Sequence, residues 1–172
     1  MLSLRLLSFL VYLLSWAGVA LGAVWSVLPT RQTAPVHHHL LGTLLQLAGV
    51  MVITLGLPDG PLRPSRAELM LALVLAPAGA GLYLATVAAG RRGGLVTSGP
   101  FALVRHPMYL AFLLLLGATA ALAAAGWRTA PAVALYLAGS ELRLAHEESA
   151  LAGAAYAAYR ARTRWRYLPG LR

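Results

Sequence analysis

The chain contains no cysteine, and charged residues of either sign are scarce. Without cysteine there is no disulfide framework and no thiol nucleophile. Charged residues make up 11% of the 172 residues, whereas soluble domains average roughly 25%. With 59% hydrophobic residues and a mean hydropathy of +0.72, the chain is not an ordinary soluble domain. The composition therefore predicts an integral membrane protein.

Five apolar runs approach the length of about 20 residues that a helix needs to cross the hydrocarbon core. They cover residues 6–28, 40–57, 67–90, 108–125 and 130–144. The last two are joined by only Gly126–Thr129, which predicts a tight helical hairpin. We predict an all-α fold, a polytopic membrane bundle of about five transmembrane helices. Residues 1–172 would form one domain, with a loop at 91–107 and an amphipathic, interfacial C-terminal tail at 145–172.

The first run has a feature of a secretion signal, since Arg5 precedes it. Its apolar part is longer than the roughly 7 to 15 residues usual in such signals. We therefore predict a true membrane span.

Acidic residues are the scarcest charged group, with five against fourteen arginines and a net charge of +9. In a membrane protein the distribution of arginine indicates topology. Five spans with the N-terminus outside place ten arginines inside and four outside. The inner set is Arg31, Arg91, Arg92, Arg105, Arg143, Arg160, Arg162, Arg164, Arg166 and Arg172, and the outer set is Arg5, Arg63, Arg66 and Arg128. This predicts a multi-pass protein of a bacterial inner membrane, with the 91–107 loop and the C-terminus in the cytosol.

Two polar segments carry less specific signals. The tail from Ala152 to Arg172 alternates aromatic residues with arginine, which suits anionic lipid at a membrane surface better than single-stranded nucleic acid. His37, His38 and His39 could in principle ligate a metal. Consecutive residues on a helix point about 100° apart, so we expect a polar collar there and no metal site.

The segment Ser98–Ala111 places a polar, turn-forming cluster directly before an apolar run. Pro107 suits the first turn of a helix. Arg105 and His106 would then lie at the membrane surface, beside a helix N-terminus that favours anions. The simpler alternative is an interfacial anchor followed by an ordinary helix start.

A second polar cluster ends the fifth run. It consists of Glu141, Arg143, His146, Glu147 and Glu148. Arg143 and Glu147 are four residues apart and can pair along one helix face, while Glu141 and Glu148 share another face. Taken alone, the cluster could simply mark the helix emerging into water. A hairpin returns to the face it left, however, so we expect this cluster to meet Arg105 and His106 in one pocket at the membrane surface.

Together, these motifs resemble those of the isoprenylcysteine carboxyl methyltransferase and phospholipid methyltransferase superfamily. The resemblance covers about Arg91 to Pro169. It rests on these motifs: Leu95-Val96-Thr97, Gly99-Pro100-Phe101, Arg105-His106-Pro107-Met108-Tyr109, Arg143-Leu144-x-x-Glu147-Glu148-x-x-Leu151 and Gly153-x-x-Tyr156-x-x-Tyr159.

The resemblance implies a methyltransferase that uses S-adenosylmethionine at the cytosolic ends of the last two spans. It implies a cofactor site formed by Gly93, Gly94, Leu95, Val96, Phe101, Arg105, His106, Pro107, Met108, Tyr109 and Glu147. Arg143 would face the methyl acceptor, and we add His106 and Glu148 as candidate catalytic residues. A carboxylate suits ribose hydroxyls or an amino group, and an arginine suits an acidic group.

The acceptor is expected to be lipophilic and to enter sideways from the bilayer. An isoprenylcysteine-type carboxylate is favoured, with a phospholipid amine, a small thiol or another hydrophobic metabolite as alternatives. A carboxylate needs no general base, whereas an amine or thiol could lose its proton to His106, His146 or Glu148.

Two other functions stay open, an NADPH-dependent membrane reductase and a non-catalytic lipid-binding membrane protein. The oligomeric state is also open, since Gly79 and Gly81 permit close packing within or between chains.

Overall fold

The computed structural model describes residues 2–27, 40–54, 63–91, 94–151, 153–168 and 170. In these residues all regular structure is helical, which confirms the predicted all-α class. The helices are α1 (Leu2–Val27), α2 (Leu40–Thr54), α3 (Arg66–Gly90), α4 (Pro100–Leu103), α5 (Pro107–Leu122), the 3₁₀ helix η1 (Gly126–Arg128), α6 (Thr129–Ala150) and α7 (Ala154–Arg162). His37–His39 and Gly93 lie outside the described residues.

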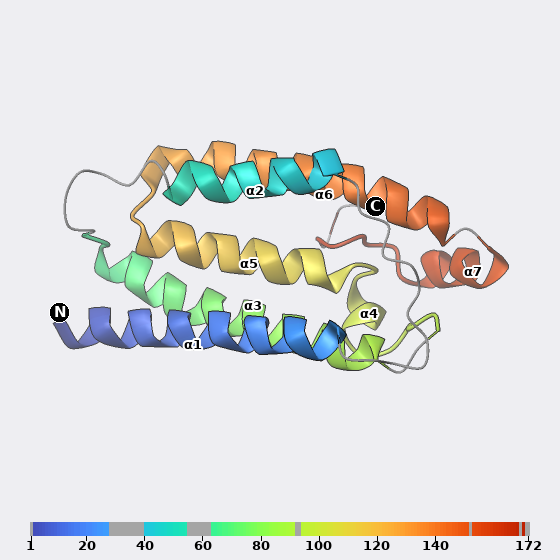
Figure 1. The fold of residues 1–172 in the computed structure, drawn as a ribbon, viewed down its shortest axis with the longest axis horizontal. Coiled ribbons are helices and arrows are strands. Elements are labelled where there is room, and N and C mark those ends of the chain that lie inside the picture. Colours follow the sequence, from blue (N-terminus) through green and yellow to red (C-terminus); the bar gives the residue numbers. More distant parts are fainter. Residues whose placement is uncertain are drawn as a thin grey trace.

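The long helices run alternately back and forth along one axis (Figure 1). α3 packs against both α1 and α5, and α2 packs against α6. The short helices α4 and α7 lie at one end of the bundle, which we call the α7 end, and η1 lies at the other, the η1 end (Figure 1). The α7 end is where α5 begins and α6 finishes.

Two helices among the described residues, α1 and α3, are long and apolar enough to cross a membrane. The helices α2 and α5 are apolar but have only 15 and 16 residues. At about 1.5 Å per residue, a helix of that length falls short of the hydrocarbon core, which is about 30 Å thick. The number of five spans therefore stays a prediction.

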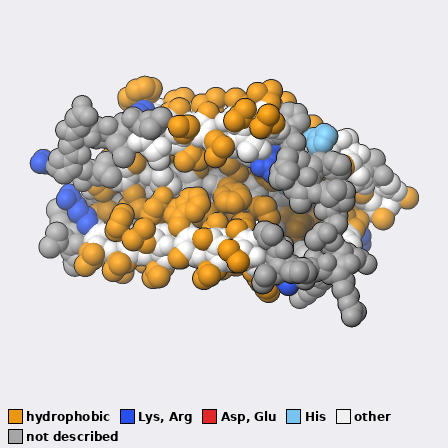
Figure 2. Space-filling view, in the orientation of Figure 1, with side chains coloured by type: hydrophobic (Ala, Val, Ile, Leu, Met, Phe, Trp, Pro, Cys, Tyr) orange, Lys and Arg blue, Asp and Glu red, His pale blue; other side chains and the backbone are white. Residues whose placement is uncertain are grey.

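The surface agrees with a membrane environment. Many large apolar side chains of α1 and α2 are exposed, among them Leu6, Leu14, Leu21, Leu40 and Leu44. Figure 2 shows hydrophobic side chains over the middle of one face, with arginines gathered toward its two ends. Such an extended apolar surface is unusual on a soluble monomer.

Local sequence signals account for the starts of two helices, α3 at the η1 end of the bundle and α5 at the α7 end. At α3, Ser65 and Glu68 form a capping box, in which each side chain bonds the backbone N–H of the other residue. At α5, Pro107 occupies the first turn with His106 as N-cap, as predicted.

The predicted hairpin between the last two runs is short, because η1 links α5 to α6 almost directly. The two helices nevertheless make few contacts with each other, since α5 packs mainly on α3 and α6 on α2. The side chains between these two helix groups line the cavity described below.

Close packing of α2 on α6 depends on glycine. A Cβ atom built on Gly139 would lie 2.4 Å from the carbonyl oxygen of Gly42, and one on Gly49 would lie 2.6 Å from that of Ala132. No side chain fits at those distances, and it is glycine that allows the two backbones to approach so closely. This approach brings Gln46 of α2 against α6.

The C-terminal tail is partly built into the protein. α6 continues past Leu144 to Ala150, and α7 buries Tyr156 and Tyr159 while Arg160 and Arg162 stay exposed. Beyond α7 the chain returns to the bundle, where Tyr167 is almost fully buried against Tyr109 and Leu144. Arg164 and Trp165 stay exposed in this segment, so an interfacial role for the tail stays a prediction.

Candidate functional site

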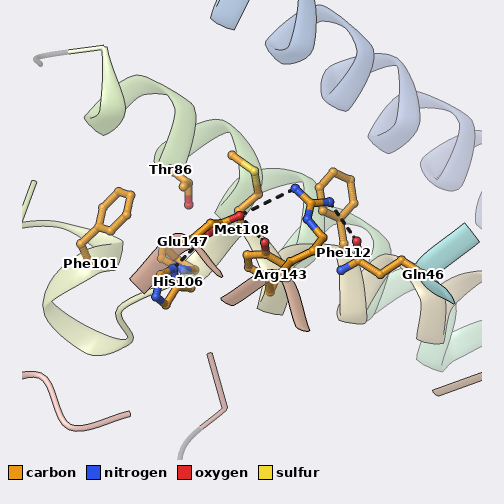
Figure 3. A pocket seen from close by; sticks show the side chains of 10 residues that line it. Gln46, Thr86, Phe101, His106, Met108, Phe112, Arg143 and Glu147 are labelled. Carbon is orange, nitrogen blue, oxygen red and sulfur yellow. Dashed lines mark hydrogen bonds and ion pairs between the residues drawn. The ribbon is translucent and has the colours of Figure 1, made fainter. Parts of the chain in front are cut away.

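A cavity of about 190 Å³ lies at the α7 end, between the α2–α6 pair and the helices α3 and α5. Its walls come from α2, α3, α4, α5 and α6, so no single motif builds it. The lining residues are Gln46, Thr86, Phe101, His106, Pro107, Met108, Tyr109, Phe112, Arg143 and Glu147. Figure 3 shows Gln46, Arg143, Glu147 and His106 in succession along the cavity, with aromatic side chains beside them.

The C-terminal tail holds the motif Arg105–Tyr109 in place. The backbone N–H groups of Arg105 and His106 donate to the carbonyl oxygens of Trp165 and Arg166, at 2.9 and 2.8 Å. Arg105 also donates through Nη1 to the carbonyl oxygens of Thr163 and Arg164. The segment before α5 is thereby tied to a segment almost sixty residues later in the chain.

Glu148 is the centre of a buried charge network beside the cavity. Its Oε1 lies 3.1 Å from Arg105 Nη2 and 3.3 Å from His106 Nε2, and its Oε2 accepts from Arg166 at 3.0 Å. Arg166 also pairs with Glu141, as expected if Glu141 and Glu148 share a helix face. Burial by itself raises the pKa of Glu148, but the hydrogen bonds from His106 and Arg166 and the charges of Arg166 and Arg105 outweigh it and lower that pKa.

Glu147, the neighbouring carboxylate, faces the cavity instead. Its Oε1 accepts a hydrogen bond of 2.5 Å from the hydroxyl of Tyr109, and its Oε2 lies 3.6 Å from His106 Nδ1. Arg143 Nη2 is 3.8 Å away, which confirms the predicted pairing one helical turn apart. With 30% of its side chain exposed, Glu147 remains accessible to a ligand in the cavity.

Arg143 is the cation of the cavity. Its Nη1 donates to Gln46 Oε1 at 2.9 Å, and its guanidinium lies over the ring of Tyr109, 5.4 Å from the centroid. The Nε–H is buried and has no hydrogen-bond partner among the described residues. Arg143 therefore keeps one donor without a partner among the described residues, in a guanidinium that lines the cavity.

The structure confirms that the two predicted polar clusters meet. Of the predicted site residues, the cavity brings together Phe101, His106, Pro107, Met108, Tyr109, Arg143 and Glu147. Arg105 and Glu148 lie next to it, within the buried charge network. Gly94 and Leu95 are exposed and, with Val96, do not line the cavity, and Gly93 lies outside the described residues.

Three lining residues were not predicted. Thr86 and Phe112 occur within apolar runs and belong to none of the motifs, and Gln46 is the lone amide in the second run. A polar residue in a membrane segment is a functional signal, so Gln46 could have been singled out. Arg166 was predicted only as part of a lipid-binding tail, because its pairing with Glu148 depends on how the tail returns.

Comparison with known proteins identifies the family. No curated protein and no solved structure matches the chain. The model of the isoprenylcysteine carboxyl methyltransferase (ICMT) family matches residues 66–153, slightly more than half of the chain. The match runs from α3 through α6 and includes both polar clusters, the one with Arg105 and His106 and the one from Glu141 to Glu148. The chain therefore belongs to the ICMT family of membrane methyltransferases.

Proposed function

We propose that this membrane methyltransferase uses S-adenosylmethionine to methylate a lipophilic acceptor, with an isoprenylcysteine-type carboxylate favoured. The observation that carries the proposal is the meeting of Arg143, Glu147 and His106 in one cavity with aromatic walls. An arginine–glutamate pair from one motif and an imidazole from the other thus face a shared space.

The chemistry of the lining fits this cofactor. Glu147 can accept hydrogen bonds from ribose hydroxyls or an amino group, and the guanidinium of Arg143 can donate to a carboxylate. The faces of Phe101 and Phe112 suit a positively charged sulfur. When bound, S-adenosylmethionine would supply a methyl group for in-line transfer to a nucleophile, with the methyl–sulfur bond breaking and S-adenosylhomocysteine leaving.

The side chains of the site then have the task of binding and orienting. Aligning reactants at near-attack distance can supply about 7 to 11 kcal/mol of a barrier. Arg143, fixed by Gln46 and Tyr109, would hold an acidic acceptor. The apolar wall around it would keep water from the nucleophile.

The charge network supports a carboxylate acceptor over an amine or a thiol. Glu148 is held by three basic side chains, and its lowered pKa makes it a poor proton acceptor. His146 is exposed and does not line the cavity. His106 lines the cavity and is the one of the three candidate bases left for an amine or a thiol. A carboxylate nucleophile needs no general base, so it places the fewest demands on these residues.

For the whole chain we propose a single domain with five spans, an outside N-terminus and a cytosolic site at the α7 end, in a bacterial inner membrane. The acceptor would enter from the bilayer and the cofactor from the cytosol. Exposed arginines of α7, such as Arg160 and Arg162, would rest on anionic lipid.

Calorimetry on purified protein tests the cofactor assignment. We expect His106→Ala and Glu147→Ala to abolish S-adenosylmethionine binding, because each removes a polar group from the cavity. Glu141→Ala is the matched control, since Glu141 lies on the same helix but does not line the cavity. Unchanged affinity in both cavity variants would defeat the assignment.

A labelling experiment tests the acceptor. Purified protein is incubated with methyl-labelled S-adenosylmethionine and total membrane lipid, and the species that gains label is identified. We expect a base-labile methyl ester. Label on an amine or a thiol would overturn the carboxylate assignment, and oxidation of added NADPH without methyl transfer would overturn the function.

A further inference from the structure

A second cavity lies at the η1 end, far from the methyl-transfer site. Its volume is about 290 Å³, near the lower end of the roughly 300 to 1,000 Å³ usual for ligand pockets. It is lined by Arg5, Phe9, Tyr12, Ile53, Thr54, Pro64, Leu69, Thr119, Leu122 and Ala123. These residues come from the first half of α1, the end of α2, the beginning of α3 and the end of α5, with Pro64 just before α3 and Ala123 just after α5. None of them lines the cavity that contains Arg143.

The hydroxyl groups in this cavity are already satisfied. Thr119 Oγ1 donates to the carbonyl oxygen of Leu115 at 2.8 Å, so its 3.0 Å contact with Tyr12 is a hydrogen bond donated by the tyrosine. Thr54 Oγ1 donates to carbonyl oxygens of its own helix. A ligand therefore meets no free hydroxyl donor here, and most of the remaining wall is apolar.

Arg5 differs from the hydroxyl residues. Its Nε is buried and has no hydrogen-bond partner among the described residues. The cavity thus places one guanidinium, whose Nε has no partner among the described residues, beside an apolar wall. This combination fits an amphiphile with an anionic head and a hydrocarbon tail.

The surrounding charge favours the same ligand. Arg63, Arg66 and Arg128 lie near this end, and Glu68 is the one acidic residue that the structure describes there. The carboxylate of Glu68 is engaged at 2.6 Å by the backbone N–H of Ser65. Arg5 lies near the first turn of α1, where a transmembrane helix meets the headgroup layer.

We propose that this cavity binds one anionic phospholipid, with its phosphate on Arg5 and an acyl chain along Phe9, Ile53 and Leu122. The site goes beyond the proposed methyl transfer and does not depend on it. Binding would occur in the absence of any methyl donor.

Native mass spectrometry of the full chain released from detergent tests this inference. Phosphatidylglycerol and phosphatidylcholine with identical acyl chains are compared, and glycerol 3-phosphate serves as a ligand with a headgroup and no tail. We expect one phosphatidylglycerol to be retained in preference to phosphatidylcholine, and no retention of glycerol 3-phosphate. Equal retention of the two lipids would overturn the proposal, as would retention of glycerol 3-phosphate.

Charge variants then locate the lipid. Arg5→Gln should weaken phosphatidylglycerol binding about fivefold, as expected for one basic residue at an anionic lipid surface. Arg63→Gln removes the same charge from an exposed position outside the cavity and should weaken binding much less than Arg5→Gln. Arg5→Lys retains the charge and should keep the preference for phosphatidylglycerol over phosphatidylcholine. It replaces Arg5→Gln if that variant fails to fold. An equal loss in the Arg5→Gln and Arg63→Gln variants, or loss of the preference with Arg5→Lys, would overturn the site.

Discussion

At the scale of the residue, Glu147 and Glu148 are neighbours in the chain with different surroundings. Glu148 is 8% exposed and is held by Arg105, His106 and Arg166. Glu147 faces the cavity, where the hydroxyl of Tyr109 is its shortest contact. The structure therefore separates a carboxylate that holds the site together from one that can contact a ligand.

Replacing Glu148 should destabilise the fold more than breaking a surface ion pair does. In Glu148→Gln the buried Arg105 loses its counter-charge and Arg166 keeps only Glu141, which is expected to lower the free energy of unfolding by about 3 kcal/mol. Denaturant titration in detergent measures this change. The matched control is Glu141→Gln, which removes one partly exposed partner of Arg166 and should cost about 1 kcal/mol or less. Equal losses in the two variants would contradict the assignment.

The lowered pKa of Glu148 also predicts a pH dependence. A carboxylate whose folded-state pKa is depressed stabilises the protein above its unfolded pKa of about 4.3, and this contribution is lost as the pH falls further. We expect the native chain to lose stability below about pH 4, and Glu148→Gln to lose less over the same range. Thermal unfolding from pH 7 to pH 3 compares them, and parallel curves would contradict the prediction.

Gln46 orients Arg143 in this structure, because its amide oxygen accepts from Nη1 while its amide nitrogen donates to Ser140. Gln46→Leu should raise the KM for the acceptor about tenfold, since a hydrogen bond to a charged group contributes about 1.5 kcal/mol. Leu47→Ala changes an exposed neighbour on the same helix and should leave the KM unchanged. A fall in kcat at constant KM would argue against a role in binding the acceptor.

At the scale of the element, the α2–α6 contact positions one wall of the site. Gly42 and Gly139 face each other across it, and a Cβ on Gly42 would lie 2.6 Å from Arg143 Cγ. Helix packing and site geometry are therefore coupled at this contact. The family match begins at residue 66, so α2 contributes to the site from outside the matched region.

Gly139→Ala should force these helices apart. Overpacking a close contact costs about 1 to 3 kcal/mol, so we expect a lower midpoint in thermal unfolding and weaker cofactor binding. Gly81→Ala is the matched control, because a Cβ there meets nothing within 4 Å and alanine favours the helix. If both variants unfold like the native chain, the α2–α6 backbones are not in close contact.

At the scale of the whole molecule, the long helices alternate in direction, which agrees with successive membrane crossings (Figure 1). The topology prediction places η1 outside and α7 in the cytosol. The absence of cysteine makes this directly testable, because an introduced thiol is the only one in the chain.

Trp127→Cys and Arg160→Cys place single thiols at exposed positions in η1 and α7. In intact cells, a membrane-impermeant maleimide should label the first from outside. The second should react only after the membrane is permeabilised. Labelling of both from the same side would show that α6 does not cross the membrane.

Several features of the site followed from local rules. Pro107 begins α5, Arg143 and Glu147 pair one turn apart, and the two polar clusters meet, because helix geometry and a short connection determine each of them. Other features depend on contacts between distant segments. Gln46 reaches Arg143 only because α2 packs on α6, and Arg166 reaches Glu148 only because the tail turns back.

Composition, apolar run length and motif spacing are properties of the chain, so they were enough to predict the all-α class, the membrane environment and the family. Which carboxylate faces the cavity, which amide holds Arg143 and how the tail secures Arg105 depend on the folded arrangement. The physical reason is that hydrogen bonds and ion pairs depend on distances of a few ångströms between distant segments. Those distances are set by how closely the helix backbones pack.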